Sequence, residues 1–142
     1  MSKVSEILKT KSSTVWSVTP QSTLINALKL MAEKNLGAVL VMDGPTIAGI
    51  FSERDLARHT ARHSLRPEEV LITDMMTSRI TTVSPDQTTD ECMAIMTSKH
   101  IRHLPVVEND KLIGLISIGD VVKRIIEDHK FAISQLEGYV NG

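Results

Sequence analysis

Apolar and polar positions along the chain follow the same order of patterns twice. The first half opens with a short β-branched run, Val15–Val18, that predicts a strand. Apolar residues at helical spacing follow over 24–32 and predict a helix. Two apolar runs, Ala38–Met42 and Ile47–Phe51, flank the polar turn Asp43–Thr46 and predict a hairpin, because Asp, Gly and Pro are favoured in turns. A second helix is expected to begin at Ser52.

The second half repeats this order with different residues. A strand is expected over Ile80–Val83, and a helix around Cys92–Met96. A hairpin is expected from the runs Leu104–Val107 and Leu112–Ile116 on either side of the turn 108–111. The last helix should begin at Ser117 and continue to about residue 140. Its distal part is apolar beyond what one repeat needs, which suggests packing on the other repeat or on a partner chain.

An internal duplication explains this recurrence. At an offset of 65 residues the two halves align without a gap, and even Ile7 falls on Ile72. Identical residues coincide at many positions, including the pairs Pro20 and Pro85, Met31 and Met96, Gly49 and Gly114, Ser52 and Ser117, and Asp55 and Asp120. We therefore predict an α/β (α+β) fold of two tandem β-α-β-β-α repeats related by a pseudo-two-fold. The repeats are expected to span 1–65 and 66–142, with a linker over 63–70.

Composition narrows the class of protein. The 142 residues are 42% apolar and 23% charged, the balance of a globular protein of about one domain. A net charge of −1 and 3% aromatic residues argue against nucleic-acid binding. No apolar run is long enough for a membrane span and the N-terminus has no signal-like segment, so a cytoplasmic protein is expected. The single cysteine, Cys92, excludes an internal disulfide, is expected in the core, and leaves no multi-cysteine metal site.

One motif occurs in register in both repeats: Gly, two apolar residues, Ser, two variable residues and Asp. It covers Gly49–Asp55 and Gly114–Asp120. The simplest interpretation is a helix cap, because Ser followed three residues later by an acid resembles a capping box. The same geometry also suits a ligand, since a helix N-terminus attracts phosphate and a carboxylate there can accept both hydroxyls of a ribose. Glycine at the strand would let a flat base approach the backbone. Spacing alone leaves both interpretations open.

The chain resembles a CBS domain pair, or Bateman module, from about Val4 to Ile126. The resemblance rests on the two Gly-x-x-Ser-x-x-Asp motifs, the Val-Thr-Pro and Val-Ser-Pro strand ends, the segment Ile101–Val106, and Thr73–Thr77 before the second repeat. The ending 131–140 is similar to that of small stand-alone bacterial CBS-pair proteins.

The resemblance implies a nucleotide site in each repeat. The Asp of each motif would bind ribose hydroxyls and the Ser would lie by the ribose and phosphate, which assigns Ser117 with Asp120 and Ser52 with Asp55. The first strand of each repeat would line the adenine slot, through Thr81 and Thr82 in one and Trp16 and Ser17 in the other. Near the second site, Arg102 and His103 are candidates for phosphate, with Leu104 and Pro105 against the base.

The two implied sites are unequal. Where the second repeat has Arg102 and His103, the first has Gly37 and Ala38, so it lacks those phosphate ligands. It has Arg54 inside its motif instead, and Arg58 one turn later, and arginine is a good phosphate ligand. The alternative for both arginines is a solvated helix face. The second site is expected to be the more complete.

The resemblance implies a non-catalytic sensor that binds AMP, ADP, ATP or NAD(H) and acts through a homodimer on an unidentified downstream protein. CBS pairs commonly associate into dimers through their helices. The alternative is a ligand-free structural or protein-interaction scaffold. An enzyme is not expected, because the chain has neither a nucleophile-elbow arrangement nor a Gly-x-x-x-x-Gly-Lys loop. No catalytic residue, catalytic cofactor, metal site, nucleic-acid partner or membrane partner is predicted.

Overall fold

The computed structural model describes residues 1–12 and 14–141, with side chains up to residue 139, so Val140 of the expected apolar stretch lies outside the described side chains. The chain forms two compact units. Trp16–Ile80 makes one, here called the repeat-1 unit, and Met1–Val15 with Thr81–Gly142 makes the other, the repeat-2 unit. Each unit therefore combines one repeat with the segment that precedes the other repeat.

The repeat-1 unit contains a three-stranded sheet in the order β1-β2-β3, in which β1 runs parallel and β3 antiparallel to β2. Its elements follow the predicted order β-α-β-β-α and add a short 3-10 helix at the end. They are β1 (Ser17–Val18), α2 (Leu24–Lys34), β2 (Ala38–Asp43), β3 (Thr46–Ser52), α3 (Glu53–Arg62) and η1 (Ile72–Asp74).

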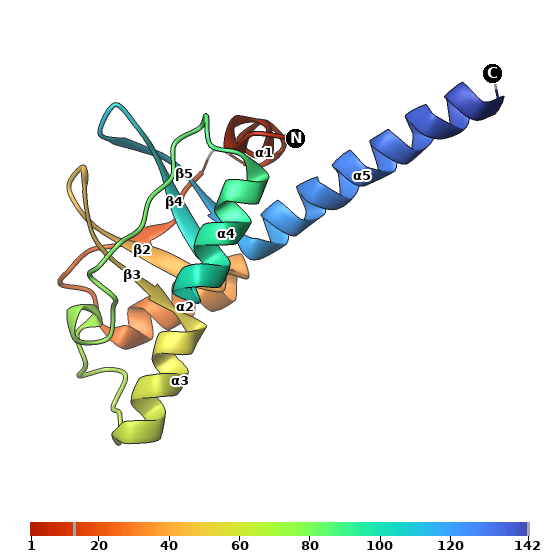
Figure 1. Ribbon diagram of the computed structural model, residues 1–142. Coiled ribbons are helices and arrows are strands. Elements are labelled where there is room, and N and C mark those ends of the chain that lie inside the picture. The colour runs from red at the N-terminus through yellow and green to blue at the C-terminus, as the bar shows by residue number, and fades with distance from the viewer. Residues whose placement is uncertain (13, 142) are drawn as a thin grey trace. The chain divides into compact units, whose positions relative to one another are not determined.

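The repeat-2 unit has the same core arrangement around the antiparallel pair β4-β5. Helix α1 of the N-terminal segment lies beside β5 and α5 (Figure 1). The elements of this unit are α1 (Val4–Thr10), α4 (Thr89–Lys99), β4 (His103–Glu108), β5 (Lys111–Ser117) and α5 (Ile118–Asn141). Both predicted hairpins and all four predicted helices are confirmed, each within a few residues of its expected bounds.

The strand predicted over Ile80–Val83 is wrong, because only Val83 pairs there, through a single parallel bridge to Val106. In the other unit Ser17 pairs with Leu40, and the residue in the place of Leu40 is Pro105. Proline has no N–H to donate to a ladder. The second repeat therefore keeps the bonds from Val83 N to Pro105 O and from Val107 N to Val83 O. The pairing does not extend towards Thr81, because Pro105 has no N–H to donate.

The helices that follow the first strands begin and end in equivalent ways. The hydroxyls of Thr23 and Thr88 accept the backbone N–H three residues on and cap α2 and α4. The residues after the two helices, Asn35 and His100, take the left-handed conformation, with φ of 55° and 54°. Both are residue types that tolerate this region better than most.

A buried cluster fills each unit, and the preceding segment supplies part of it. Val4 and Ile7 of α1 join the cluster of the repeat-2 unit, while Ile72 and Met75 join that of the repeat-1 unit. The structural counterpart of Val4 is thus Ile72 and that of Ile7 is Met75. The pairing of Ile7 with Ile72 at the repeat offset is wrong, since the equivalent residues here are 68 apart. Cys92 is buried in the same cluster as Val4, as expected for a small core residue.

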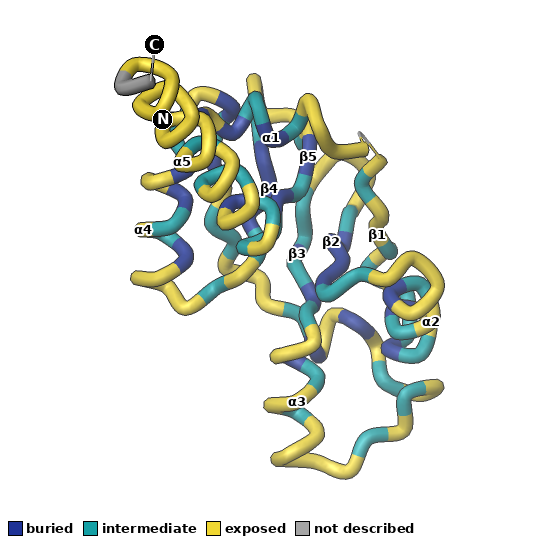
Figure 2. Tube along the Cα trace, turned by 90° about the vertical axis from the view of Figure 1, so that its right-hand side faces the viewer, coloured by how far each residue is buried: buried dark blue, intermediate teal, exposed yellow. Residues whose placement is uncertain are grey.

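Helix α5 continues well past the core of its unit. Val121 is buried and Ile125 packs on the cluster, but every described side chain from His129 to Tyr139 is exposed (Figure 2). Ile133 is 54% and Leu136 65% exposed, far more than apolar side chains of a covered helix. In the described residues, no helix has both the length and the apolar content needed to cross a bilayer.

Candidate functional site

The second Ser-x-x-Asp motif forms the junction between β5 and α5. Ser117 N donates to Asp120 Oδ2 at 2.8 Å, and Asp120 N donates to Ser117 Oγ at 3.2 Å. The two side chains thus satisfy backbone groups at the start of α5 reciprocally, which is the geometry of a capping box. The carboxylate remains partly accessible, with 28% of the Asp120 side chain exposed.

The first motif is built in the same way but is more enclosed. Ser52 N donates to Asp55 Oδ2 at 2.8 Å, and Asp55 N donates to Ser52 Oγ at 3.4 Å. Asp55 is only 8% exposed. The capping interpretation of both motifs is therefore confirmed. It is compatible with a ligand at Asp120, whose carboxylate reaches solvent.

The backbone pairing brings the other expected residues of the second site to the same junction. His103 pairs with Ser117 across the hairpin, and Arg102 O accepts from Ile118 N at 2.8 Å. Thr81 and Thr82 precede Val83, the residue bridged to β4. Leu104 and Pro105 are both buried, Leu104 within the core cluster, and their side chains alternate between the two faces of β4.

The expected residues of the first site also converge, around the end of β3. Ala38 pairs with Ser52, and Gly37 O accepts from Glu53 N at 3.1 Å. Ser17 pairs two residues further along β2, with Leu40. Four residues of this site are exposed. They are Ser17, Trp16, whose ring centre Lys34 approaches to 4.4 Å, and the arginines Arg54 and Arg58 of α3.

The motif glycines serve packing, which differs from the expected approach of a base. A Cβ on Gly114 would lie 2.6 Å from Leu8 Cδ2 of α1, and one on Gly49 would overlap Met76 Sδ and lie 3.0 Å from Thr77 O. In each unit the segment preceding the other repeat packs directly on the glycine. Close contact between protein segments therefore accounts for glycine at both positions.

Sequence reasoning missed the residue in closest contact with the second motif, Lys11. Its Nζ lies 2.6 Å from Asp120 Oδ2 and 2.7 Å from Leu115 O. Burial of the carboxyl opposes its ionisation, but hydrogen bonds from Lys11 and Ser117 and the lysine charge outweigh this and hold the pKa of Asp120 below its ordinary value. No spacing rule links residues 11 and 120, so only the packing of α1 on the second repeat reveals the pair.

The first motif has a neutral partner in the corresponding place. Thr77 Oγ1 donates to Asp55 Oδ1 at 3.2 Å. Thr77 N also donates to Ile50 O at 2.8 Å, and Ile50 is the residue that corresponds to Leu115. In the repeat-1 unit the Thr77 hydroxyl and the Thr77 backbone N–H donate to the Asp carboxylate and to the carbonyl oxygen after the motif glycine. In the repeat-2 unit the Lys11 side chain alone contacts the two equivalent acceptors. In the described residues, no group of three or more His, Cys, Asp or Glu side chains could hold a metal ion.

Comparison with known proteins agrees with this architecture. The family model for the CBS domain matches residues 4–62 and again 72–127. A CBS-domain protein from Burkholderia ambifaria MC40-6 is 48% identical, with a TM-score of 0.84 over 89% of this chain and 96% of that one. The CBS-domain protein ATU1752 from Agrobacterium tumefaciens is 36% identical, with a TM-score of 0.83 over 87% and 98% of the two chains.

A curated relative from a plant extends the likeness. CBSX3, a mitochondrial CBS-domain protein of Arabidopsis thaliana, is 32% identical over 98% of this chain and 72% of its own length. The solved relatives are covered almost whole by this chain and are small CBS-domain proteins, as the sequence resemblance predicted. No catalytic family is indicated by these matches. With two CBS domains in tandem, the chain belongs to the CBS-domain family.

Proposed function

We propose that the protein is a non-catalytic regulatory module that binds an adenine nucleotide, AMP, ADP, ATP or NAD(H), at the second Ser-x-x-Asp motif. The observation that carries the proposal is the Asp120 carboxylate. It lies at a strand-to-helix junction, is partly exposed and is held in its charged form. A carboxylate in such a position can accept both hydroxyls of a ribose, and the start of α5 beside it favours phosphate.

A solved relative supports the class of ligand. CBSX2 has been solved in complex with AMP, and it shares this fold with a TM-score of 0.76 over 89% of this chain. At 23% identity the likeness extends to the fold alone. The choice of adenine nucleotides here therefore rests on the family and on the chemistry around Asp120, with Ser117, Thr81, Thr82, Arg102 and His103 as the expected neighbours of the ligand.

Thermal unfolding with a panel of ligands tests the proposal. AMP, ADP, ATP, NAD, NADH and GMP would each be added to the wild type, to Asp120→Asn and to the control Asp110→Asn, an exposed turn residue of the same repeat. A ligand at about 100 times its Kd adds about 2.7 kcal/mol to the stability of the folded state. We expect an adenine nucleotide to raise the Tm of the wild type and the control, and to lose most of that effect in Asp120→Asn.

The alternative function is a scaffold without a ligand, and one observation favours it: both acids already cap helices. If no nucleotide changes the Tm of any of the three proteins, the motifs act as caps only. The chain is then an interaction protein.

We also propose that the protein acts as a homodimer joined along one exposed side of α5. Val122, Ile126, Ile133 and Leu136 are exposed and, with His129, follow a spacing of four and three residues along one side of the helix. A spacing of four and three residues with isoleucine at Ile126 and Ile133 and leucine at Leu136 is typical of two-stranded helix pairing, and His129 is the polar position of this seam. The second copy covers apolar surface that would otherwise face water.

Leu136→Asp is expected to convert the dimer to a monomer. A carboxylate in an apolar helix seam loses its hydration without gaining a partner. Light scattering should give twice the chain mass of 15.7 kDa for the wild type and 15.7 kDa for the variant. The control Ser134→Asp, exposed and off the seam, should remain a dimer. A monomeric wild type contradicts the proposal.

The downstream protein and the cellular compartment belong to the same proposal. We propose that the module passes its signal to another protein. A cytoplasmic location stays a prediction.

A further inference from the structure

The two motifs differ most in which groups donate hydrogen bonds to two acceptors. These are the carboxylate of the motif Asp and the backbone carbonyl of the residue after the motif glycine, Ile50 or Leu115. In the repeat-1 unit, Thr77 is held by backbone bonds in both directions, from Ile50 N to Thr77 O at 2.9 Å and from Thr77 N to Ile50 O at 2.8 Å. The neighbouring Met76 packs on Gly49. The backbone bridge therefore keeps Thr77 beside Asp55, and its short side chain cannot withdraw into water as a long one can.

In the repeat-2 unit, the equivalent acceptors are held by a side chain alone. The backbone of Lys11 ends α1, where its N–H donates to Leu8 O at 3.4 Å. From there its flexible stem carries the ammonium to Asp120 and Leu115. The Lys11 side chain is 37% exposed, so the ammonium can withdraw into water by rotation of the stem with the backbone unchanged.

We propose that Lys11 is a displaceable internal occupant of the repeat-2 site, whose ammonium holds Asp120 and Leu115 O until the hydroxyls of a ribose replace it. The inference rests on the proposed function, because it takes the Asp120 carboxylate as the ribose acceptor. It deepens that function in two ways. It assigns ligand exchange to the second repeat, with Asp55 kept as a structural cap, and it makes the lysine a competitor that weakens binding.

Adenosine is the probe that separates this competition from attraction to phosphate, because it carries the ribose hydroxyls and the base without a charge. Calorimetric titration would compare the wild type with Lys11→Met, which keeps the apolar stem and removes the ammonium. Lys9→Met is the matched control, an exposed lysine two residues earlier with the same change of charge. Since an exposed ion pair stabilises by up to about 1 kcal/mol, Lys11→Met should bind adenosine about threefold to fivefold more tightly.

The same titration in the double variant Lys11→Met, Asp120→Asn shows whether the gain acts through the carboxylate, and it should abolish the gain. Unchanged or weaker adenosine binding by Lys11→Met, in a protein whose wild type binds AMP through Asp120, overturns the competitor role and leaves the proposed function standing. If neither the wild type nor Lys11→Met binds adenosine or AMP, the proposed function and this inference fail together. Melting of each variant without ligand verifies that all are folded.

Discussion

Ile7→Ala is expected to destabilise the part of the chain that carries the second repeat, although Ile7 precedes the first repeat in the sequence. Ile7 is 3% exposed and packs in the cluster of the repeat-2 unit. Removing its three outer carbons leaves a cavity that neighbouring side chains fill only in part. Substitutions of this kind cost about 2–5 kcal/mol of unfolding free energy. Native-state hydrogen exchange should show faster exchange of amides in β4, β5 and α4.

Ile72→Ala is the matched substitution and should act on the other unit. Ile72 is fully buried in the cluster that contains Leu24 and Phe51, so its loss should speed exchange in β2, β3 and α2 by a similar free energy. Ile7→Val, which removes one carbon, should cost about 0.5–1.5 kcal/mol and affect the same amides as Ile7→Ala. Faster exchange of β2 and β3 in Ile7→Ala, with β4 and β5 unchanged, would show that the units follow the sequence halves instead.

The repeats could be predicted from the sequence because their information is local. Turn residues, apolar periodicity and cap residues each act within a few positions, and the offset of 65 residues doubles every such signal. Thr23 and Thr88 begin equivalent helices, and Ser52 and Ser117 begin the next ones. The elements of one repeat therefore support the assignment of the other.

The partnership of each repeat with a distant segment could not be predicted, because no local signal encodes it. Val4, Ile7 and Leu8 have the spacing of an apolar helix face, but nothing in that pattern says which core they enter. The gapless alignment also pairs these residues with the wrong counterparts. The chain between this segment and the first strand of the following repeat is three residues longer before repeat 1 than before repeat 2. The short pairing before β4, by contrast, could have been predicted. Pro105 lies within the predicted strand Leu104–Val107, and a proline there cannot donate to the neighbouring strand, so that only Val83 pairs with β4.

The candidate site was predictable to a similar degree. Ser117 and Asp120 stand out because they recur in register, and the structure gives them the reciprocal contacts of a cap. The contact of Lys11 with Asp120 could not be predicted in this way, because Lys11 has no chemically similar counterpart in the other repeat. The residue in its place is Thr77, which is held beside Asp55 by backbone pairing. The two sites thus also differ in the segments that cover them, outside the motif itself.

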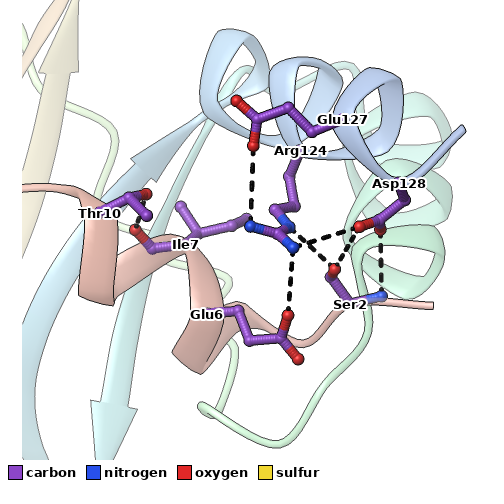
Figure 3. A network of polar contacts seen from close by, with 7 residues as sticks. All are labelled: Ser2, Glu6, Ile7, Thr10, Arg124, Glu127 and Asp128. Carbon is purple, nitrogen blue, oxygen red and sulfur yellow. Dashed lines mark hydrogen bonds and ion pairs between the residues drawn. The ribbon is translucent and has the colours of Figure 1, made fainter. Parts of the chain in front are cut away.

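The second large effect is expected for Arg124→Met, which removes the centre of a polar network between α5 and the N-terminal segment (Figure 3). Arg124 Nε donates to the Ser2 hydroxyl at 2.9 Å, and its terminal nitrogens lie 3.3–3.7 Å from three carboxylates, those of Glu6, Glu127 and Asp128. Hydrogen bonds to charged groups contribute about 1.5–3 kcal/mol each when a partner is lost. Urea unfolding should therefore show a loss of about 1.5–3 kcal/mol, against little change for Arg62→Met on the exposed end of α3.

The pH dependence of stability provides an independent measure of this network. The hydrogen bond from the Ser2 hydroxyl, with the Arg124 charge and despite some loss of hydration, lowers the pKa of Asp128. A carboxyl group whose pKa is lower in the folded than in the unfolded chain stabilises the fold above its unfolded pKa of about 3.9, and that stability is lost as the pH falls through the folded pKa. Wild type should therefore be more stable than Asp128→Asn at pH 7, and the difference should shrink below about pH 4. A difference that stays constant from pH 7 to pH 3 would mean that the Asp128 charge adds nothing to the attachment of the N-terminal segment.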